Sequence, residues 1–196
     1  MPNMARIRKE YKEVRESKDG SGVSAELVNE DFTHWKGTVQ GPSGTPYDGG
    51  LFVVDIVIPG NYPFEPPKMR FDTRVWHPNI SSQTGAICLD ILKTEWSPAL
   101  TLRTALLSLQ ALLSCPNPDD PQDGQVAGQY KKDRAEFERT ARFWTQTYAQ
   151  PPKAVDVAAA MRNLMEMGFP EKACADALAK CKNDETAAVE WLMTHS

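Results

Sequence analysis

Two adjacent prolines constrain the fold of this chain more than any other sequence feature. Pro151 and Pro152 follow Ala149-Gln150, and no helix continues through such a pair, because each proline lacks a backbone N–H and its ring obstructs the preceding turn. The chain has 196 residues, so the part before the prolines is long enough to bury a core of its own. We therefore predict a large domain over residues 1–150, a linker over residues 151–153 and a small domain over residues 154–196.

The large domain combines helical and strand patterns. Apolar residues recur at helical spacing in three segments, residues 4–14, 101–114 and 137–148. The second segment is apolar almost all round, which predicts a central buried helix, and the aromatic face of the third, with Trp144 and Tyr148, is expected in the core. Apolar and β-branched runs predict four strands, over residues 23–29, 34–40, 51–59 and 68–71. Because the links between them are short and rich in turn residues, we expect an α+β fold with an antiparallel four-stranded sheet and flanking helices.

The small domain contains three short helical patterns. The first ends at Met167-Gly168-Phe169, where Gly168 suits the left-handed conformation that follows a helix. Pro170 suits the first turn of the second helix, and Asn183 or Asp184 can cap the third. These residues predict a compact three-helix bundle with a thin core.

Composition disfavours several classes of protein. A net charge of -4 argues against nucleic acid as the main partner, since phosphate binding requires a basic face. The N-terminus lacks the apolar core of a signal peptide, and no apolar run is long enough to span a membrane. None of the four cysteines forms a C-x-x-C pair, so neither a zinc site nor a redox motif is indicated. We expect an intracellular protein, located in the cytoplasm or also in the nucleus, without a membrane partner.

The stretch from Trp76 to Pro98 carries the candidate chemistry. Cys88 follows a small Gly85-Ala86 step, and Asn79 lies in the rigid turn His77-Pro78-Asn79. A cysteine hydrolase requires a histidine base, but none of the three histidines fits that role. His77 precedes a proline, where its ring is better explained as a support for the turn. We therefore interpret Cys88 as an exposed nucleophile that works without a general base.

A thiol without a base can still carry an acyl group. Exchange between a thiol and a thioester is nearly isoenergetic, so the group can be accepted and passed on without strong activation. When an amine attacks such a thioester, the Asn79 amide could stabilise the oxyanion or hold the loop that does. Desolvation together with a nearby carboxylate, from Asp119 or Asp120, could keep the amine neutral. Taken singly, each residue also has an ordinary structural explanation, such as a turn position for Asn79.

Taken together, the motifs of residues 1–150 resemble the catalytic domain of ubiquitin-conjugating enzymes. In chain order these motifs are His34-Trp35, Gly41-Pro42, Gly44-Thr45-Pro46-Tyr47, Gly50 with Phe52, Tyr62-Pro63-Phe64-Glu65-Pro66-Pro67, His77-Pro78-Asn79, Gly85-Ala86-Ile87-Cys88-Leu89-Asp90, Trp96-Ser97-Pro98-Ala99 and Pro116-Asn117-Pro118-Asp119-Asp120-Pro121. Residues 154–196 resemble a ubiquitin-associated (UBA) domain with Met167-Gly168-Phe169 as its recognition loop. This combination is similar to chain-building members of the family, and it implies polyubiquitin chains of the type read by the proteasome.

The resemblance implies a role for each candidate catalytic residue. Cys88 would receive ubiquitin as a thioester from the activating enzyme, which is the component that uses ATP, so no cofactor or metal is expected in this chain. Asn79 would support the oxyanion or the catalytic loop. Asp120 would orient the incoming lysine and lower its pKa, and Asp90 would border the active site.

The resemblance also implies partner surfaces. The activating enzyme and ligases of the RING or U-box type would share a surface composed of Arg6, Arg8, Phe64, Trp96, Ser97, Pro98 and Ala99. From the sequence alone, Phe64 equally suits a buried plug of its loop. In the small domain, ubiquitin would contact Met167, Gly168, Phe169 and Leu192, although Leu192 equally suits the bundle core. Protein substrates complete the expected partners, and we expect a monomer.

Two other functions compete with this interpretation. One is a catalytically weak scaffold that only binds ubiquitin through its tail, and Cys88 argues against it. The other is conjugation of a different ubiquitin-like modifier, which a ubiquitin-binding tail disfavours.

Overall fold

The computed structural model describes residues 2–16, 20–151, 156–181 and 183–195, and it divides the chain into two compact units. The first unit spans Met1–Pro151 and the second spans Pro152–Ser196. Most of the predicted linker, residues 152 and 153, lies outside the described residues. Within the parts that the structure describes, no helix is long and apolar enough to cross a membrane.

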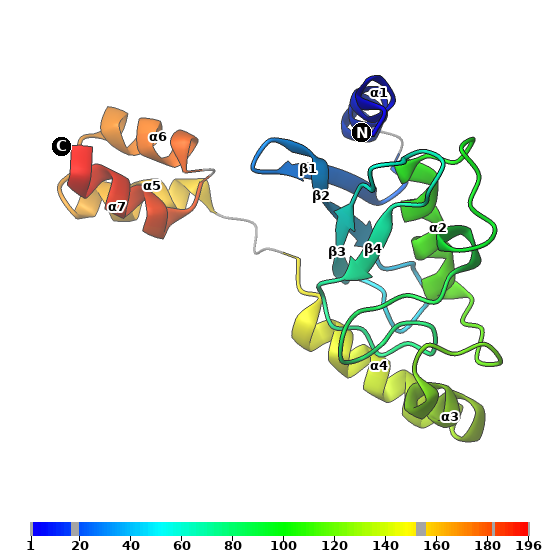
Figure 1. The fold of residues 1–196 in the computed structure, drawn as a ribbon. Coiled ribbons are helices and arrows are strands. Elements are labelled where there is room, and N and C mark those ends of the chain that lie inside the picture. Colours follow the sequence, from blue (N-terminus) through cyan, green and yellow to red (C-terminus); the bar gives the residue numbers. More distant parts are fainter. Residues whose placement is uncertain (1, 17–19, 152–155, 182, 196) are drawn as a thin grey trace. The chain divides into compact units, whose positions relative to one another are not determined.

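The first unit is built on the predicted antiparallel sheet (Figure 1). Its strands follow chain order and comprise β1 (Val23–Val28), β2 (Asp31–Gln40), β3 (Leu51–Val57) and β4 (Lys68–Phe71). The register places Trp35 opposite Ile56 and Val39 opposite Phe52, so apolar side chains of neighbouring strands share one face. The four-stranded antiparallel sheet predicted from the sequence is confirmed.

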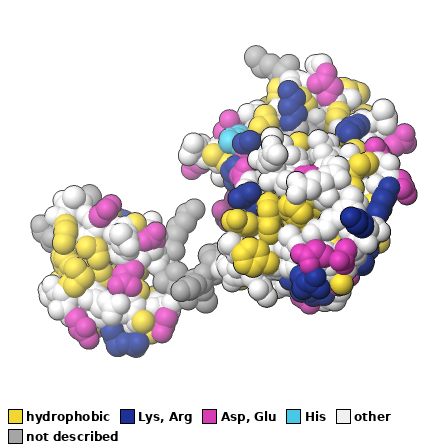
Figure 2. Space-filling model, turned by 90° about the horizontal axis from the view of Figure 1, so that it is seen from below, with side chains coloured by type: hydrophobic (Ala, Val, Ile, Leu, Met, Phe, Trp, Pro, Cys, Tyr) yellow, Lys and Arg dark blue, Asp and Glu magenta, His cyan; other side chains and the backbone are white. Residues whose placement is uncertain are grey.

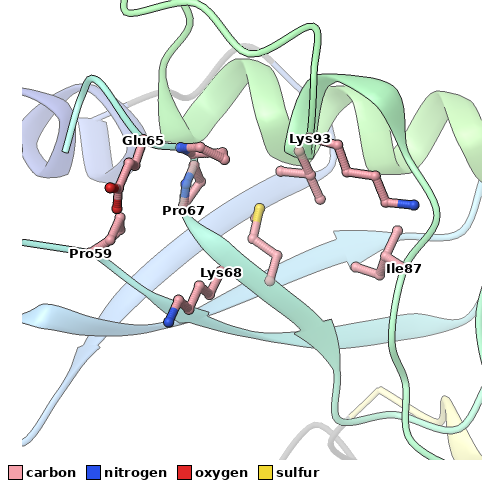
Figure 3. Close-up of a pocket in the computed structure, with 9 residues that line it drawn as sticks. Pro59, Glu65, Pro67, Lys68, Ile87 and Lys93 are labelled. Atoms are coloured by element: carbon pink, nitrogen blue, oxygen red, sulfur yellow. The ribbon is translucent and has the colours of Figure 1, made fainter. Parts of the chain in front are cut away.

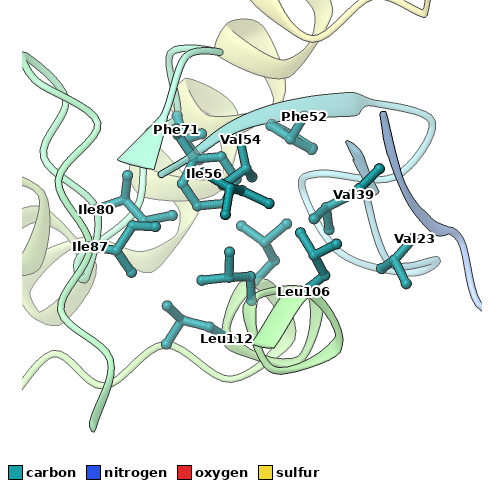
Figure 4. Packing of buried hydrophobic residues seen from close by; sticks show 14 of the residues in the cluster. Val23, Val39, Phe52, Val54, Ile56, Phe71, Ile80, Ile87, Leu106 and Leu112 are labelled. Atoms are coloured by element: carbon teal, nitrogen blue, oxygen red, sulfur yellow. The ribbon is translucent and has the colours of Figure 1, made fainter. Parts of the chain in front are cut away.

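Helix α2 (Leu102–Ser114) packs on the apolar face of this sheet. Its Leu106 contacts β2 at Gly37, where a β-carbon added to the glycine would lie only 2.8 Å from the leucine side chain. The absence of a side chain at Gly37 therefore allows helix and strand to approach closely. Figure 4 shows Leu106 and Leu112 directed toward Val54 and Ile56 of β3. This layer is the core that fixes the positions of the loops around it.

Other helices flank the first unit. They are α1 (Met4–Glu16), α3 (Gly124–Lys132) and α4 (Arg134–Tyr148), with the short 3₁₀ helix η1 (Asp90–Leu92) in the loop before α2. Helices α3 and η1 were not among the predicted elements. The expected aromatic core face of α4 is only partly correct, because Phe137 is buried whereas Trp144 is half-buried and Tyr148 is exposed. The last two rings instead stack against the guanidinium of Arg74 at the surface.

A long irregular segment leads from β4 to α2 and carries the candidate chemistry. Backbone contacts hold it to the sheet: Phe71 N–H donates to Gly85 O at 2.9 Å, and Arg70 forms a bridge with Ala86. Gly85 has a φ of 72°, and a β-carbon there would lie 1.9 Å from Phe71 O. Glycine is therefore required at residue 85, which explains the small Gly85-Ala86 step before Cys88.

The second unit is the predicted three-helix bundle. Its helices are α5 (Val157–Glu166), α6 (Glu171–Lys180) and α7 (Glu185–His195). Asp156 caps α5 by accepting from Ala159 N, and Asp184 accepts from Ala187 N at the start of α7. The core is small, as expected for a unit of this size, and consists of Ala160, Leu164, Cys174, Ala177, Leu178, Ala188 and Leu192.

Candidate active site

Cys88 is half-buried at the side of an open hollow of about 370 Å³. Its backbone N–H donates to Asn79 O at 2.8 Å, and Ile87 before it bridges to Ile80, so the adjacent residues Asn79 and Ile80 hold the cysteine segment through main-chain contacts. The hollow is lined by Asn79, Cys88, Leu89, Asp90, Lys93, Thr94, Leu112, Asn117 and Asp120. The structure thus brings together all four residues that the sequence proposed for catalysis.

The side chain of Asn79 connects the cysteine segment to the loop before α3. Its Nδ2 donates to Asn117 O at 2.8 Å and to Asp120 O at 2.9 Å, and its Oδ1 accepts from Asn117 N at 2.8 Å. Both amide hydrogens are therefore engaged by backbone carbonyls rather than directed at Cys88. Of the two roles considered for Asn79, this geometry favours support of the loop over direct stabilisation of an oxyanion.

The two candidate carboxylates have different surroundings. The Cys88 thiol donates to Asp120 Oδ2 at 3.5 Å, whereas Asp119 forms an ion pair with Lys131 at 2.8 Å. Asp119 is exposed and turned to its lysine partner, so its charge is already paired away from the thiol. The structure therefore selects Asp120 from the pair as the carboxylate next to the sulfur.

Lys93 is a site residue that sequence reasoning missed. Its Nζ donates to Cys88 Sγ at 3.2 Å. The contact depends on η1, which turns the chain back after Asp90 so that a residue five positions after the cysteine reaches the sulfur. Asp90 itself begins η1, where its Oδ1 accepts from Ile91 N at 2.6 Å. No sequence pattern signals Lys93, because the short 3₁₀ turn that places it was not predicted.

Lys93 also lines a second hollow, of about 330 Å³ (Figure 3). Met69, Ile87 and Leu92 provide its apolar surface, and Glu65 and Lys68 lie at its edge. Lys93 is the residue that lines both hollows.

His77 is a structural residue rather than a base. Its ring is fully buried, its Nε2 donates to Leu112 O at 3.0 Å and its Nδ1 accepts from Asn79 N at 3.0 Å. Burial lowers the pKa of His77 to about 4, because the charged imidazolium would lose its hydration. The neutral ring therefore supports the turn that carries Asn79, as the sequence suggested.

The predicted partner surface lies on three segments of the first unit. Phe64 is 80% exposed, which resolves the alternative of a buried plug, and Ser97, Pro98 and Ala99 are exposed as well. Trp96 is half-buried and donates from Nε1 to Pro63 O at 2.8 Å. On α1, Arg8 is exposed with its guanidinium 5.4 Å from the centre of the Phe32 ring, whereas Arg6 is turned inward toward Glu10.

The second unit requires a correction. Met167 is exposed, Gly168 has a φ of 94° and Phe169 is half-buried against the bundle core, so the predicted recognition loop has the expected left-handed turn. Leu192, however, is only 1% exposed and belongs to the core, so the prediction that it contacts ubiquitin directly is wrong. Its neighbour Met193 is 65% exposed on the same helix. The rotation of α7 about its axis decides which of the two residues is exposed, and this rotation was not predicted from the sequence.

Charged side chains of both signs share one face of the larger unit (Figure 2). Figure 2 shows Lys, Arg, Asp and Glu side chains interspersed on the visible face of the larger unit, with hydrophobic side chains gathered between them. Among the residues that the structure describes, no cluster of three or more His, Cys, Asp or Glu side chains could hold a metal ion.

These features define a class of protein: an α+β domain in which a half-buried cysteine lies beside a carboxylate, with no histidine base among the described side chains, and which is followed by a helical bundle. A family model described as "Ubiquitin-conjugating enzyme" matches residues 6–145, and one described as "UBA-like domain" matches residues 158–196. The chain belongs to the ubiquitin-conjugating enzyme family.

Relatives match most or all of this chain. Ubiquitin-conjugating enzyme E2 27 of Arabidopsis thaliana is 51% identical over 192 residues, which cover 98% of each chain. Ubiquitin-conjugating enzyme E2 K of Homo sapiens is 49% identical over 200 residues, with both chains fully covered. The solved E2 domain of a Toxoplasma gondii ubiquitin conjugating enzyme is 56% identical, with a TM-score of 0.72 over 75% of this chain and 99% of that one.

Family membership confirms the fold class and the enzyme class predicted from the sequence. The chain is a transferase that acts through a cysteine-linked thioester, and its partners are ubiquitin, the ubiquitin-activating enzyme and ubiquitin ligases.

The buried neutral His77 predicts a specific loss of stability in acid. Above pH 6.5 the ring is neutral in both folded and unfolded chains, whereas below it the unfolded chain binds a proton that the folded chain excludes until about pH 4. The free energy of unfolding should therefore fall by about 3 kcal/mol across this window. Urea unfolding of the wild type and of His77→Gln at several pH values measures the effect. The variant should be less stable at pH 7.5 but lack this component of the pH slope, and parallel slopes would contradict the assignment.

Proposed function

We propose that Cys88 is the residue that carries ubiquitin. The observation that supports this assignment most directly is the half-buried thiol at the open hollow, with Asp120 at 3.5 Å and Lys93 at 3.2 Å. Cys174, by contrast, is buried in the bundle, and burial raises the pKa of its thiol. A buried, protonated thiol is a poor nucleophile.

Charging is a thiol exchange. The Cys88 sulfur attacks the carbonyl carbon of the thioester between ubiquitin and the activating enzyme, a new C–S bond forms, and the thiol of the activating enzyme leaves with a proton. Because one thioester replaces another, little driving force is required. ATP is consumed by the activating enzyme, so we propose that this chain needs no cofactor of its own.

Transfer to lysine forms an amide and frees the thiol. The neutral amine attacks the carbonyl carbon, the tetrahedral oxyanion collapses, and the Cys88 thiolate leaves as the C–S bond breaks. The proton that the amine nitrogen loses on becoming an amide ends on this sulfur, which restores the thiol. Asp120 stands beside the sulfur, where its carboxylate can orient the amine and accept a hydrogen bond from it. The Lys93 ammonium contacts the same sulfur and can stabilise the departing thiolate. Asn79 holds the backbone that presents Asp120, and Asp90 borders the hollow.

The partner face proposed for RING- or U-box-type ligases and the activating enzyme is the set of three exposed segments around Phe64, Ser97–Ala99 and Arg8. An aromatic side chain exposed to the extent of Phe64 gains free energy when a partner buries it. Shared use of this face would make the two partners bind in turn. We further propose a monomeric, cytoplasmic enzyme, also present in the nucleus, that modifies protein substrates.

The second unit supports a role in building chains. Met167, Gly168 and Phe169 would contact ubiquitin, with Met193 in place of Leu192 as the contact from α7, since Met193 is exposed. An enzyme that binds ubiquitin non-covalently can retain a growing chain. The chains proposed are polyubiquitin of the type read by the proteasome.

The assignment of Cys88 and of the product can be tested together. Incubation with activating enzyme, ATP and ubiquitin should give an adduct on non-reducing gels that thiols remove. The adduct should be absent from Cys88→Ala and become a thiol-resistant ester in Cys88→Ser. A series of ubiquitin variants, each retaining a different single lysine, should then be supplied in turn, and only one of them should support chain synthesis. A charged wild type that makes no chains, or makes them from every lysine alike, would contradict the chain-building proposal.

Adjacent aspartates provide a matched test of lysine activation. Asp120→Asn should slow discharge of the thioester to free lysine by about 10- to 100-fold, because the carboxylate beside the sulfur is lost. Asp119→Asn removes the same charge one residue away and should leave the rate within about twofold, since Asp119 pairs with Lys131. Single-turnover discharge measures both rates, with charging as the control that should be unaffected. Equal rates for the two variants would refute the role of Asp120.

Neighbouring residues on α7 provide a second matched pair. Met193→Ser should weaken binding of free ubiquitin about tenfold, as expected when an exposed apolar side chain that the complex would bury is lost. The bundle should stay folded. Leu192→Ala should instead lower the stability of the second unit by about 2–5 kcal/mol, because it opens a core cavity. An NMR titration with ubiquitin gives affinities, and thermal unfolding gives stabilities. Unchanged ubiquitin affinity in Met193→Ser would exclude this residue from the interface.

A further inference from the structure

Glu10 is a buried carboxylate that the catalytic mechanism does not use. It lies on α1 and is only 1% exposed. Removing an ionised carboxylate from water costs several kcal/mol unless it is paired and hydrogen-bonded. The buried Glu10 carboxylate therefore requires hydrogen-bond donors around it.

Three hydrogen-bond donors from three separate segments converge on this carboxylate. Tyr62 OH lies 2.8 Å from both oxygens, Leu102 N donates to Oε2 at 2.7 Å, and Arg6 Nε donates to Oε1. Leu102 is the first residue of α2, so the carboxylate also lies at the positive end of that helix dipole. The charge is thus stabilised by a cation, a phenol and a helix N-terminus together.

Each of these segments carries part of the partner face. Arg6 is on the helix that presents Arg8, Tyr62 begins the loop that presents Phe64, and Leu102 begins α2 directly after the loop that presents Ser97–Ala99. Two further bonds connect the segments directly: Arg6 Nη2 donates to Leu100 O at 2.9 Å, and Trp96 Nε1 donates to Pro63 O at 2.8 Å. Glu10 is the group at which all three segments meet.

We propose that Glu10 is a positioning residue for the partner face, acting through Tyr62, Arg6 and Leu102 to hold its three segments in register. This inference rests on the proposed function, which assigns that face to the activating enzyme and the ligases. Glu10 does not line the hollow around Cys88, so the thiol chemistry is separate from it. Loss of the carboxylate should consequently impair docking and not the intrinsic reactivity of the thioester.

Glu10→Gln is the informative substitution, because it keeps the shape and removes the charge. The new amide group is a donor, and it would face the donors of Tyr62, Arg6 or Leu102, so at least one segment loses its partner. We expect the KM for charging by the activating enzyme to rise about tenfold while kcat changes less than twofold. Discharge of the preformed thioester to free lysine, without any ligase, should also remain within twofold.

Two variants on the same helix control for charge and for stability. Glu13→Gln removes an equal charge from the exposed Lys9–Glu13 pair and should leave the KM unchanged. Val14→Ala lowers stability by truncating a buried side chain and should also leave the KM unchanged. If Glu10→Gln fails to fold, Tyr62→Phe removes only the phenolic donor and should raise the KM in the same direction, by a smaller factor.

The position of the face can also be observed directly. The indole N–H of Trp96 donates to Pro63 O within the face, whereas that of Trp35 donates to Phe32 O in the sheet at 2.7 Å. In ¹⁵N NMR spectra, Glu10→Gln should shift the Trp96 indole signal and leave the Trp35 signal in place. A purely local structural role would move neither the KM nor the Trp96 signal.

A reference variant separates failure of this proposal from failure of the proposed function. The double variant Arg8→Ala with Phe64→Ala should raise the KM for charging. If it does so while Glu10→Gln and Tyr62→Phe retain the wild-type KM, the positioning role is overturned and the assignment of the face stands. If the double variant itself retains the wild-type KM, the face is wrongly assigned and the role of Glu10 falls with it.

Discussion

The active site depends on the hydrogen bonds of one residue, Asn79. Its side-chain amide bonds to the backbone at Asn117 and Asp120, and its backbone carbonyl oxygen accepts from Cys88 N–H. The nucleophile and the carboxylate beside it come from segments that are more than thirty residues apart, with a 3.5 Å contact between them. Buried hydrogen bonds of this kind are strong, because a lost partner leaves a polar group without solvent. Without them, the two segments would be free to separate at the point where the thioester must meet the amine.

Neutral and charged groups have separate tasks around this asparagine. His77 is held uncharged by burial and contributes only geometry, through its bonds to Asn79 N and Leu112 O. The ionic groups, Asp120 and Lys93, lie on the open side where they reach the sulfur. This separation suits an enzyme whose substrate arrives already activated: charge is needed where the amine enters and the thiolate leaves, and not beneath the cysteine.

The sequence predicted the elements and the chemical type of the site because both depend on local pattern. Strand β3 is apolar and β-branched, and α2 is apolar almost all round. Asn79 lies in the turn His77-Pro78-Asn79, and Cys88 follows the small Gly85-Ala86 step, so turn residues mark both positions. What it did not predict depends on packing. Lys93 reaches the sulfur only because η1 turns the chain, and Met193 rather than Leu192 is exposed because of the rotation of α7. The choice of Asp120 over Asp119 likewise follows from a lysine twelve residues away from the latter, Lys131.

Gly85 affects how precisely the Cys88 sulfur is positioned. Close to this residue the loop meets β4 through main-chain atoms, with Phe71 N–H bonded to Gly85 O and no room for a β-carbon. Side chains exchange rotamers within nanoseconds, but a backbone contact of this kind has no such freedom. The backbone that carries the Cys88 side chain is therefore held by the sheet itself and not by a neighbouring side chain. An acyl carrier that has to be found by one large partner and then by another benefits from a sulfur whose location is the same at each encounter.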